Sequence, residues 1–116
     1  MKIKTSEATN EQLDRLVAQI EGIALASHFG ALSVPLNDSI GDFYAPTTDW
    51  AQGGPIIERE SIDVLRDPNG TAGWGARVYI SRRDVWCYGP TPLIAAMRCF
   101  CASKLGDEVE VPDELT

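Results

Sequence analysis

The first third of the chain carries the apolar spacing of an amphipathic α-helix. Four apolar residues fall at i, i+3, i+4 and i+7, namely Leu13, Leu16, Val17 and Ile20. Before them, Thr9 and Gln12 have the spacing of a capping box, in which each side chain bonds the backbone N–H of the other residue. Gly22 is placed to end the helix in a left-handed conformation. These positions predict a helix over residues 10–21.

A second helical pattern lies toward the C-terminal end. Thr91 suits an N-cap, and Pro92 suits the first helical position, where the N–H that it lacks would have no partner. The predicted buried stripe consists of Leu93, Ala96, Met97 and Phe100. We expect this helix to end at Gly106. Its small residues would let another element pack closely, and they are Ala95, Ala96 and Ala102.

Between the two helices, the sequence predicts strands over residues 61–65, 73–80 and 85–88. Turn-forming residues at 66–71 and 81–84 separate these strands, so neighbouring strands should run antiparallel. The predicted fold is therefore α+β, with a small, mainly antiparallel sheet packed by the N- and C-terminal helices.

Three other stretches give weaker patterns. Residues 1–8 fit a short edge strand or an ordered arm, and residues 23–36 fit a strand or an irregular connection along the sheet. Residues 37–41 have turn chemistry.

Residues 44–60 follow neither the helical nor the strand period. They read YAPTTDWAQGGPIIERE, with two prolines and two glycines that are costly inside regular elements. We expect Thr47 or Thr48 to cap a short helical turn over residues 49–51, which Gly53 and Gly54 break. Pro55 would then begin a second helical piece over residues 56–60. This stretch is predicted to be a binding loop that leads into a short helix and folds against the start of the last helix.

Composition and charge limit the choice of partners. The 116 residues are 44% hydrophobic and 23% charged, as expected for one globular domain. The net charge is −7, and most of it comes from the end of the chain. We therefore expect a compact domain over residues 1–106 and an acidic tail over 107–116, which either solubilises the protein or binds a basic partner. Binding to nucleic acid or to a membrane is not expected.

The sequence offers little for catalysis or metal binding. Three cysteines and no signal peptide favour a reducing cytoplasm, and the thiols are expected to be structural. No zinc-ligand spacing and no nucleophile motif is present, so no cofactor, metal or catalytic residue is predicted. His28 is expected to be a packed or half-exposed polar residue.

Aromatic and arginine residues supply the candidate binding site. Tryptophan can stack a flat ring, and arginine can pair with phosphate. A helix that starts at residues 89–92 either favours an anion or is a plain helix start, because two prolines remove N–H donors there. The proposed ligand-binding residues are Tyr44, Thr48, Asp49, Trp50, Arg59, Trp74, Arg77, Trp86, Thr91 and Arg98.

Two motifs of the chain resemble a known family. Residues 44–60 and the stretch GPTPLIAAMR at 89–98 are similar to the NinX family of lambdoid phages, and so are the opening MKIKT and the acidic end. The resemblance implies a small accessory protein of a phage or prophage, located in the cytoplasm of the infected bacterium. It transfers no catalytic residue.

Three functions remain open from the sequence. The first is a non-catalytic binder that sequesters a nucleotide-derived, phosphate-bearing molecule to counter host defence. The second is a protein–protein inhibitor that acts through its acidic surface, and the third is a nucleotide-cleaving enzyme. A homo-oligomer is also expected, since a small sheet has edges to protect.

Overall fold

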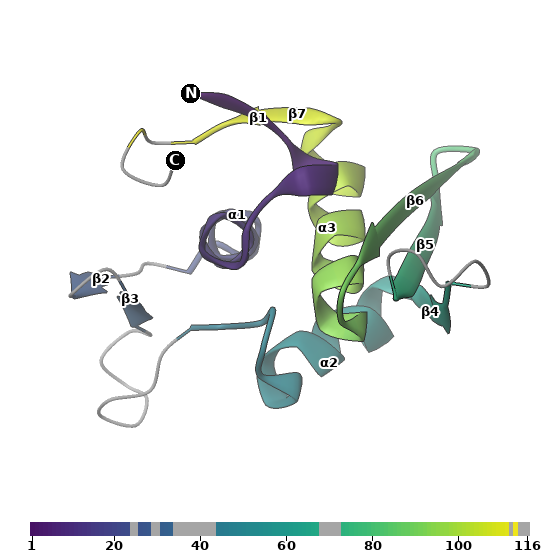
Figure 1. Ribbon diagram of the computed structural model, residues 1–116, viewed down its shortest axis with the longest axis horizontal. Helices are drawn as coiled ribbons and strands as arrows, with labels where there is room; N and C mark the ends of the chain where they lie inside the picture. The colour runs from purple at the N-terminus through teal and green to yellow at the C-terminus, as the bar shows by residue number, and fades with distance from the viewer. Residues whose placement is uncertain (24–25, 29–30, 34–43, 68–72, 112, 114–116) are drawn as a thin grey trace.

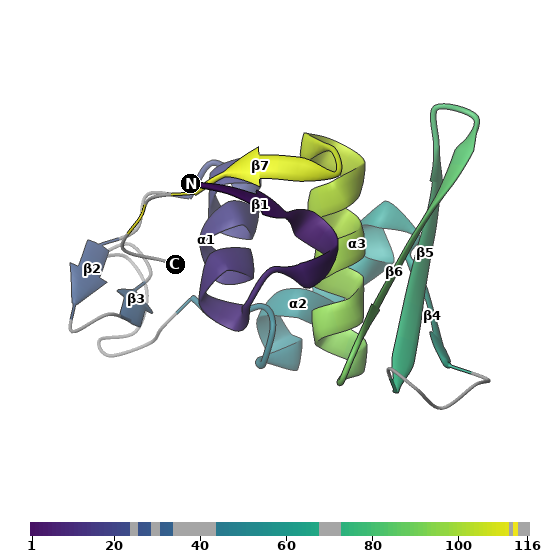
Figure 2. The same cartoon turned by 45° about the horizontal axis from the view of Figure 1, so that its top comes forward.

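The fold is arranged around one central helix. The computed structural model describes residues 1–23, 26–28, 31–33, 44–67, 73–111 and 113. Helix α3 (Pro92–Leu105) lies in the middle, with helix α1 (Asn10–Glu21) on one side (Figure 1). Helix α2 (Trp50–Glu60) runs past α3 from that side toward the sheet. A sheet covers its other side, as both views show (Figure 2).

All the strand pairs that the structure describes are antiparallel. The sheet beside α3 has the order β4-β5-β6 and consists of β4 (Asp63–Arg66), β5 (Trp74–Ile80) and β6 (Arg83–Gly89). Two smaller pairs are β1 (Lys2–Lys4) with β7 (Glu108–Glu110), and β2 (Ala26–His28) with β3 (Ala31–Ser33). A 3₁₀ turn, η1 (Thr5–Glu7), follows β1. The predicted α+β class is confirmed.

Helix α1 has the predicted ends. The N–H of Gln12 donates to Oγ1 of Thr9 at 3.4 Å, and the N–H of Thr9 donates to Oε1 of Gln12 at 2.9 Å. Gly22 closes the helix with φ of 71°. The predicted apolar face is buried at Leu13, Leu16 and Val17.

Helix α3 also has the predicted ends but is more deeply buried than a single stripe would require. Thr91 accepts a hydrogen bond from the N–H of Ile94 at 3.2 Å, and Gly106 follows the last turn. The buried residues face several directions and are Leu93, Ile94, Ala95, Ala96, Met97, Cys99, Phe100, Cys101 and Ala102. This burial makes α3 the core of the fold, because the sheet and α1 both pack on it.

The β5–β6 hairpin is tighter than the predicted turn at residues 81–84. Ile80 pairs with Arg83, so only Ser81 and Arg82 lie in the turn. Both have positive φ, 53° and 66°, as the two central residues of a type I′ turn require. The turn residues are not the usual asparagine and glycine, which explains why the sequence did not place the turn.

The prediction for residues 49–60 was wrong in two respects, because the helix is unbroken and neither Thr47 nor Thr48 caps it. Residues 50–60 form the single helix α2, which Asp49 caps by accepting from the N–H of Ala51 at 3.0 Å, and Pro55 lies inside it. Gly53 does not break the helix but lets it pack closely. A Cβ atom at this position would overlap the carbonyl oxygen of Pro46 and lie 2.7 Å from Cδ2 of Leu93.

A buried carboxylate fixes the chain that leads into α2. Oδ1 of Asp14 on α1 accepts from the N–H of Thr47 at 3.1 Å and from its hydroxyl at 2.9 Å. Both residues are buried. Loss of contact with water raises the pKa of Asp14 to about 6, and the two hydrogen bonds from Thr47 oppose this shift only in part.

The acidic end of the chain begins as part of the fold. Across the β1–β7 pair, Lys2 faces Glu110 and Lys4 faces Glu108, so opposite charges lie side by side. Val111 is buried. The division of the chain at residue 106 stays a prediction.

Some sequence predictions fall outside the described residues. They are the turn at 37–41, most of the turn at 66–71, the end of the acidic tail and the side chain of His28. Within the described part, no helix is both long and apolar enough to cross a lipid bilayer.

Substitution of Gly53 by alanine should destabilise the protein, although alanine is the better helix former. The overlap with the Pro46 carbonyl and Leu93 is expected to cost about 1–3 kcal/mol. Gly54 provides the matched control, because a Cβ atom there meets only Trp50, at 3.8 Å. Gly54→Ala should therefore stabilise by about 0.5–1 kcal/mol in urea unfolding. Equal stabilities of the two variants would contradict the close packing at Gly53.

The raised pKa of Asp14 predicts a pH-dependent stability. Between the ordinary value of 3.8 and the folded value of about 6, the folded protein binds more protons than the unfolded chain. The stabilisation from protonated Asp14 is thus complete below pH 3.8 and is lost as the pH rises through 6. Relative to Asp14→Asn, wild type should lose on the order of 2 kcal/mol between pH 4 and 7. The effect is ruled out if the difference in unfolding free energy between wild type and Asp14→Asn, measured in urea, is the same at pH 4 and pH 7.

Candidate binding pocket

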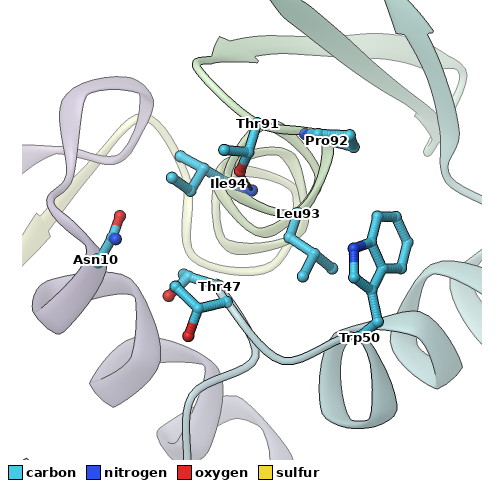
Figure 3. A pocket seen from close by; sticks show the side chains of 8 residues that line it. Asn10, Thr47, Trp50, Thr91, Pro92, Leu93 and Ile94 are labelled. Carbon is cyan, nitrogen blue, oxygen red and sulfur yellow. Dashed lines mark hydrogen bonds between the residues drawn. The ribbon is translucent and has the colours of Figure 1, made fainter.

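A pocket lies where the first turns of the three helices meet. Its cavity volume is about 280 Å³. The lining residues are Asn10 from α1, Thr47, Thr48 and Trp50 from the start of α2, and Thr91, Pro92, Leu93 and Ile94 from the start of α3. Figure 3 shows α3 end-on, with Asn10 on one side of the opening and Trp50 on the other. The predicted packing of residues 44–60 against the start of the last helix is confirmed.

Three close contacts hold the walls of the pocket in place. The Asp14 carboxylate fixes Thr47, and Gly53 lets α2 approach Leu93. A third close contact orients α3 itself, because a Cβ atom on Gly89 would lie 2.9 Å from the backbone nitrogen of Ala95. The pocket is therefore formed by packed elements and not by a free loop.

One edge of the pocket is apolar, and the rest of its wall is mainly polar. Pro92, Leu93 and the Trp50 indole lie together near one edge, and Trp50 is 56% exposed. The remaining wall consists of the hydroxyl-bearing and amide side chains Thr47, Thr48, Thr91 and Asn10, together with the apolar Ile94 between Asn10 and Thr91 (Figure 3). A flat apolar ring and a polar group can thus be accommodated side by side.

The electrostatics of the pocket come from helix termini. Backbone N–H groups in a first turn point out of the helix and carry partial positive charge. Threonine hydroxyls cap α1 and α3, and the first turn of α3 contains no acidic residue. Glu11 in the first turn of α1 and the carboxylate of Asp49 at the cap of α2 partly offset the positive ends of these two helices. The eight lining residues include no lysine or arginine.

Three of the ten sequence-predicted binding residues line this pocket, namely Thr48, Trp50 and Thr91. Asp49 lies next to it as the cap of α2. Tyr44 is instead part of the core, and burial raises its pKa to about 12.

Arg59 and Arg98 are held by intramolecular partners. The guanidinium of Arg59 donates to both carboxylate oxygens of Glu21, at 2.8 and 2.9 Å, and its Nε donates to Glu60 at 2.9 Å. Arg98 donates to the carbonyl oxygen of Ala8 at 3.0 and 3.2 Å, and to that of Tyr88 at 2.9 Å. Both side chains therefore link segments of the fold and do not line the pocket.

The other three predicted residues lie on the sheet. Trp74 is half-buried and packs on the core. Arg77 and Trp86 lie on the opposite face, where the guanidinium carbon of Arg77 is 5.8 Å from the indole centroid and its Nε is 3.2 Å from Asp84. The structure thus separates the predicted arginines from Trp50.

Five lining residues were not among the predicted set, namely Asn10, Thr47, Pro92, Leu93 and Ile94. Asn10 and Pro92 each follow a threonine N-cap, so a search for first-turn residues would have found them. Thr47 could not be recognised in this way, because its partner Asp14 is 33 residues away.

The three cysteines are free and buried. Burial raises the pKa of Cys87 to about 11 and that of Cys99 and Cys101 to about 12, so the thiols stay protonated at neutral pH. Within the described part of the chain, His, Cys, Asp and Glu side chains do not gather in threes that could hold a metal ion.

A solved structure has a similar fold. A 2.0 Å crystal structure of a phage protein from Bacillus cereus ATCC 14579 is similar, with a TM-score of 0.59 and 10% sequence identity. The similarity covers 90% of this chain and 92% of that one. At this identity, the likeness concerns the fold alone.

Sequence comparison identifies the family. No curated protein matches the chain. The family model described as bacteriophage P22 NinX matches residues 4–104, which include α1, α2, the β4–β6 sheet and nearly all of α3. Because this match extends over most of the sequence, the chain belongs to the NinX family of bacteriophage P22.

Proposed function

We propose that this phage accessory protein binds and sequesters a nucleotide-derived small molecule, without chemical change, inside the infected bacterium. Sequestration of such a molecule would counter a host defence that uses it as a signal. The observation that carries the proposal is the meeting of three helix N-termini and one exposed indole at the same pocket.

The pocket has groups for both halves of such a ligand. The Trp50 indole offers a face for stacking a base, and base–aromatic stacking is worth about 1–3 kcal/mol. The first turn of α3 has no acidic residue to oppose a phosphate, and its dipole supplies the attraction, since Pro92 lacks an N–H and the N–H of Ile94 is bonded to Thr91. Asn10 and Thr48 can bond ribose or base edges.

The size of the pocket limits what it can hold. A volume of about 280 Å³ is at the lower end for small-molecule sites, so one nucleoside unit would fill it. The remainder of a larger ligand would extend past Trp50 into solvent. We therefore expect the base and the nearest phosphate to carry the affinity.

The lining residues favour binding over cleavage. None of the eight is a histidine, cysteine, aspartate or glutamate, the side chains that most often act as general acids, bases or nucleophiles. The alternative of an inhibitor that docks through its acidic end has less support, because Glu110 and Asp113 already pair with the N-terminal amine of Met1, at 3.1 and 3.2 Å.

Binding should be detected by calorimetry against a panel of ADP-ribose, cyclic dinucleotides and the corresponding nucleosides. We expect at least one phosphate-bearing compound to bind more tightly than its nucleoside. Trp50→Ala should weaken that binding by roughly tenfold to a hundredfold. Trp86→Ala is the matched control, since Trp86 is also exposed but lies outside the pocket, and it should leave the affinity unchanged. The proposal fails if no compound of the panel gives heat or a thermal shift.

Recovery of the ligand separates a binder from an enzyme. After incubation, a bound compound should disappear from solution and return intact when the protein is denatured. Mass spectrometry of the released material checks this outcome. An altered mass would instead establish nucleotide cleavage.

A further inference from the structure

The face of the β4–β6 sheet that points away from α3 carries large side chains. Along β5 and β6, one set of alternate residues packs on the core, including Ala76, Val78 and Val85. The other set forms the outer sheet face, which we define as Leu65, Arg77, Tyr79, Trp86 and Tyr88. In both ribbon views, no described element lies over this face (Figures 1 and 2).

Most of the exposed large apolar side chains of the described residues are on this face. Of six such residues, four belong to it, with exposed fractions of 64% for Tyr79, 45% for Tyr88, 43% for Trp86 and 38% for Leu65. A single exposed aromatic residue is ordinary on a protein surface, but a contiguous group marks an interaction site.

Contacts within the group hold the aromatic rings in place. The rings of Trp86 and Tyr88 stack with centroids 6.5 Å apart and an interplanar angle of 16°. Tyr88 lies over Gly75, since a Cβ atom on that glycine would be 3.2 Å from the tyrosine ring. Arg77 covers the Trp86 indole and pairs with Asp84. Ordered aromatic side chains lose little conformational entropy when a partner binds.

Charge distinguishes the possible partners of this face. Residues 63–89 contain four arginines and three aspartates and have a net charge of +1, so the rest of the chain carries −8. Two copies of the protein therefore repel each other least when they approach through their sheets. The face also carries charges of both signs, because Asp63 lies opposite Arg77 on the neighbouring strand. Arg77 in turn lies opposite Trp86 on the third strand. A two-fold axis can bring the arginine of one copy near an aspartate of the other.

A polyanion fits less well. Single-stranded nucleic acid uses aromatic stacking in a positively charged groove. Here Asp63 and Asp84 lie among the aromatic residues, and the chain as a whole is at −7.

We propose that the outer sheet face is the interface of a homodimer, in which two copies pack sheet to sheet with Tyr79, Trp86 and Tyr88 at the centre. This proposal does not depend on the ligand pocket, because none of the pocket-lining residues belongs to the outer sheet face.

The test is the mass of the full chain in solution, measured by sedimentation at several concentrations. Wild type should be a dimer that dissociates on dilution. Tyr79→Arg should be a monomer with the thermal transition of dilute, dissociated wild type, since Tyr79 is largely exposed. Trp50→Arg is the matched control, because it adds the same charge at an exposed aromatic position outside this face, and it should stay dimeric. A wild-type monomer, or a Tyr79→Arg variant that is still a dimer, would overturn the proposal.

Salt provides a second measurement. Added salt screens the repulsion between the two acidic bodies, so the dimer should become tighter as the ionic strength rises. Nucleic-acid binding would weaken instead. If oligo-dT binds wild type, loses affinity in salt and binds Trp86→Ala more weakly, while wild type stays monomeric, the face belongs to a nucleic acid and the homodimer is excluded.

Discussion

The fold depends on the burial of helix α3, which is enclosed by the sheet, by α1 and by α2. A helix can be covered on several sides only if its neighbours approach closely, and small side chains such as Ala95, Ala96 and Ala102 allow this. The strand that precedes it must come even nearer. A Cβ atom on Gly89 would be 2.9 Å from the nitrogen of Ala95 and 3.0 Å from Cγ2 of Ile94, so glycine is required there. The start of α3 is thereby held against the end of β6.

The position of α3 determines the pocket. Its first turn lies at the surface, where α2 reaches it because Gly53 has no side chain to collide with Leu93. Helix α1 is attached to the start of α2 through Asp14, whose buried carboxylate accepts two hydrogen bonds from Thr47. The pocket thus results from packing two helices onto a third with their N-termini together. This arrangement gathers positive backbone dipoles without an arginine, as the proposed binding of a phosphate-bearing ligand requires.

The sequence predicts helix ends correctly where a residue bonds to its near neighbours in the chain. The capping box of Thr9 and Gln12 and the start of α3 at Thr91 are examples. Contacts between residues far apart in the chain cannot be predicted from a single sequence. Gly53 looked like a helix breaker because Pro46 and Leu93, which require it, are defined only by the fold. Arg59 and Arg98 looked like ligand contacts, but their partners Glu21 and Ala8 are 38 and 90 residues away. Trp50 and Thr91 were placed in one site because each begins a helix beside irregular chain.

The connection between β6 and α3 also relates the pocket to the outer sheet face. Tyr88 belongs to the sheet face and Thr91 to the pocket, and only Gly89 and Pro90 separate them. Gly89 is packed against Ala95, and proline has a restricted φ, so this connection has little freedom. Arg98 adds a bond from α3 back to the carbonyl of Tyr88 at 2.9 Å. The pocket and the outer sheet face are thus fixed relative to each other by the packing of Gly89 and the bond from Arg98.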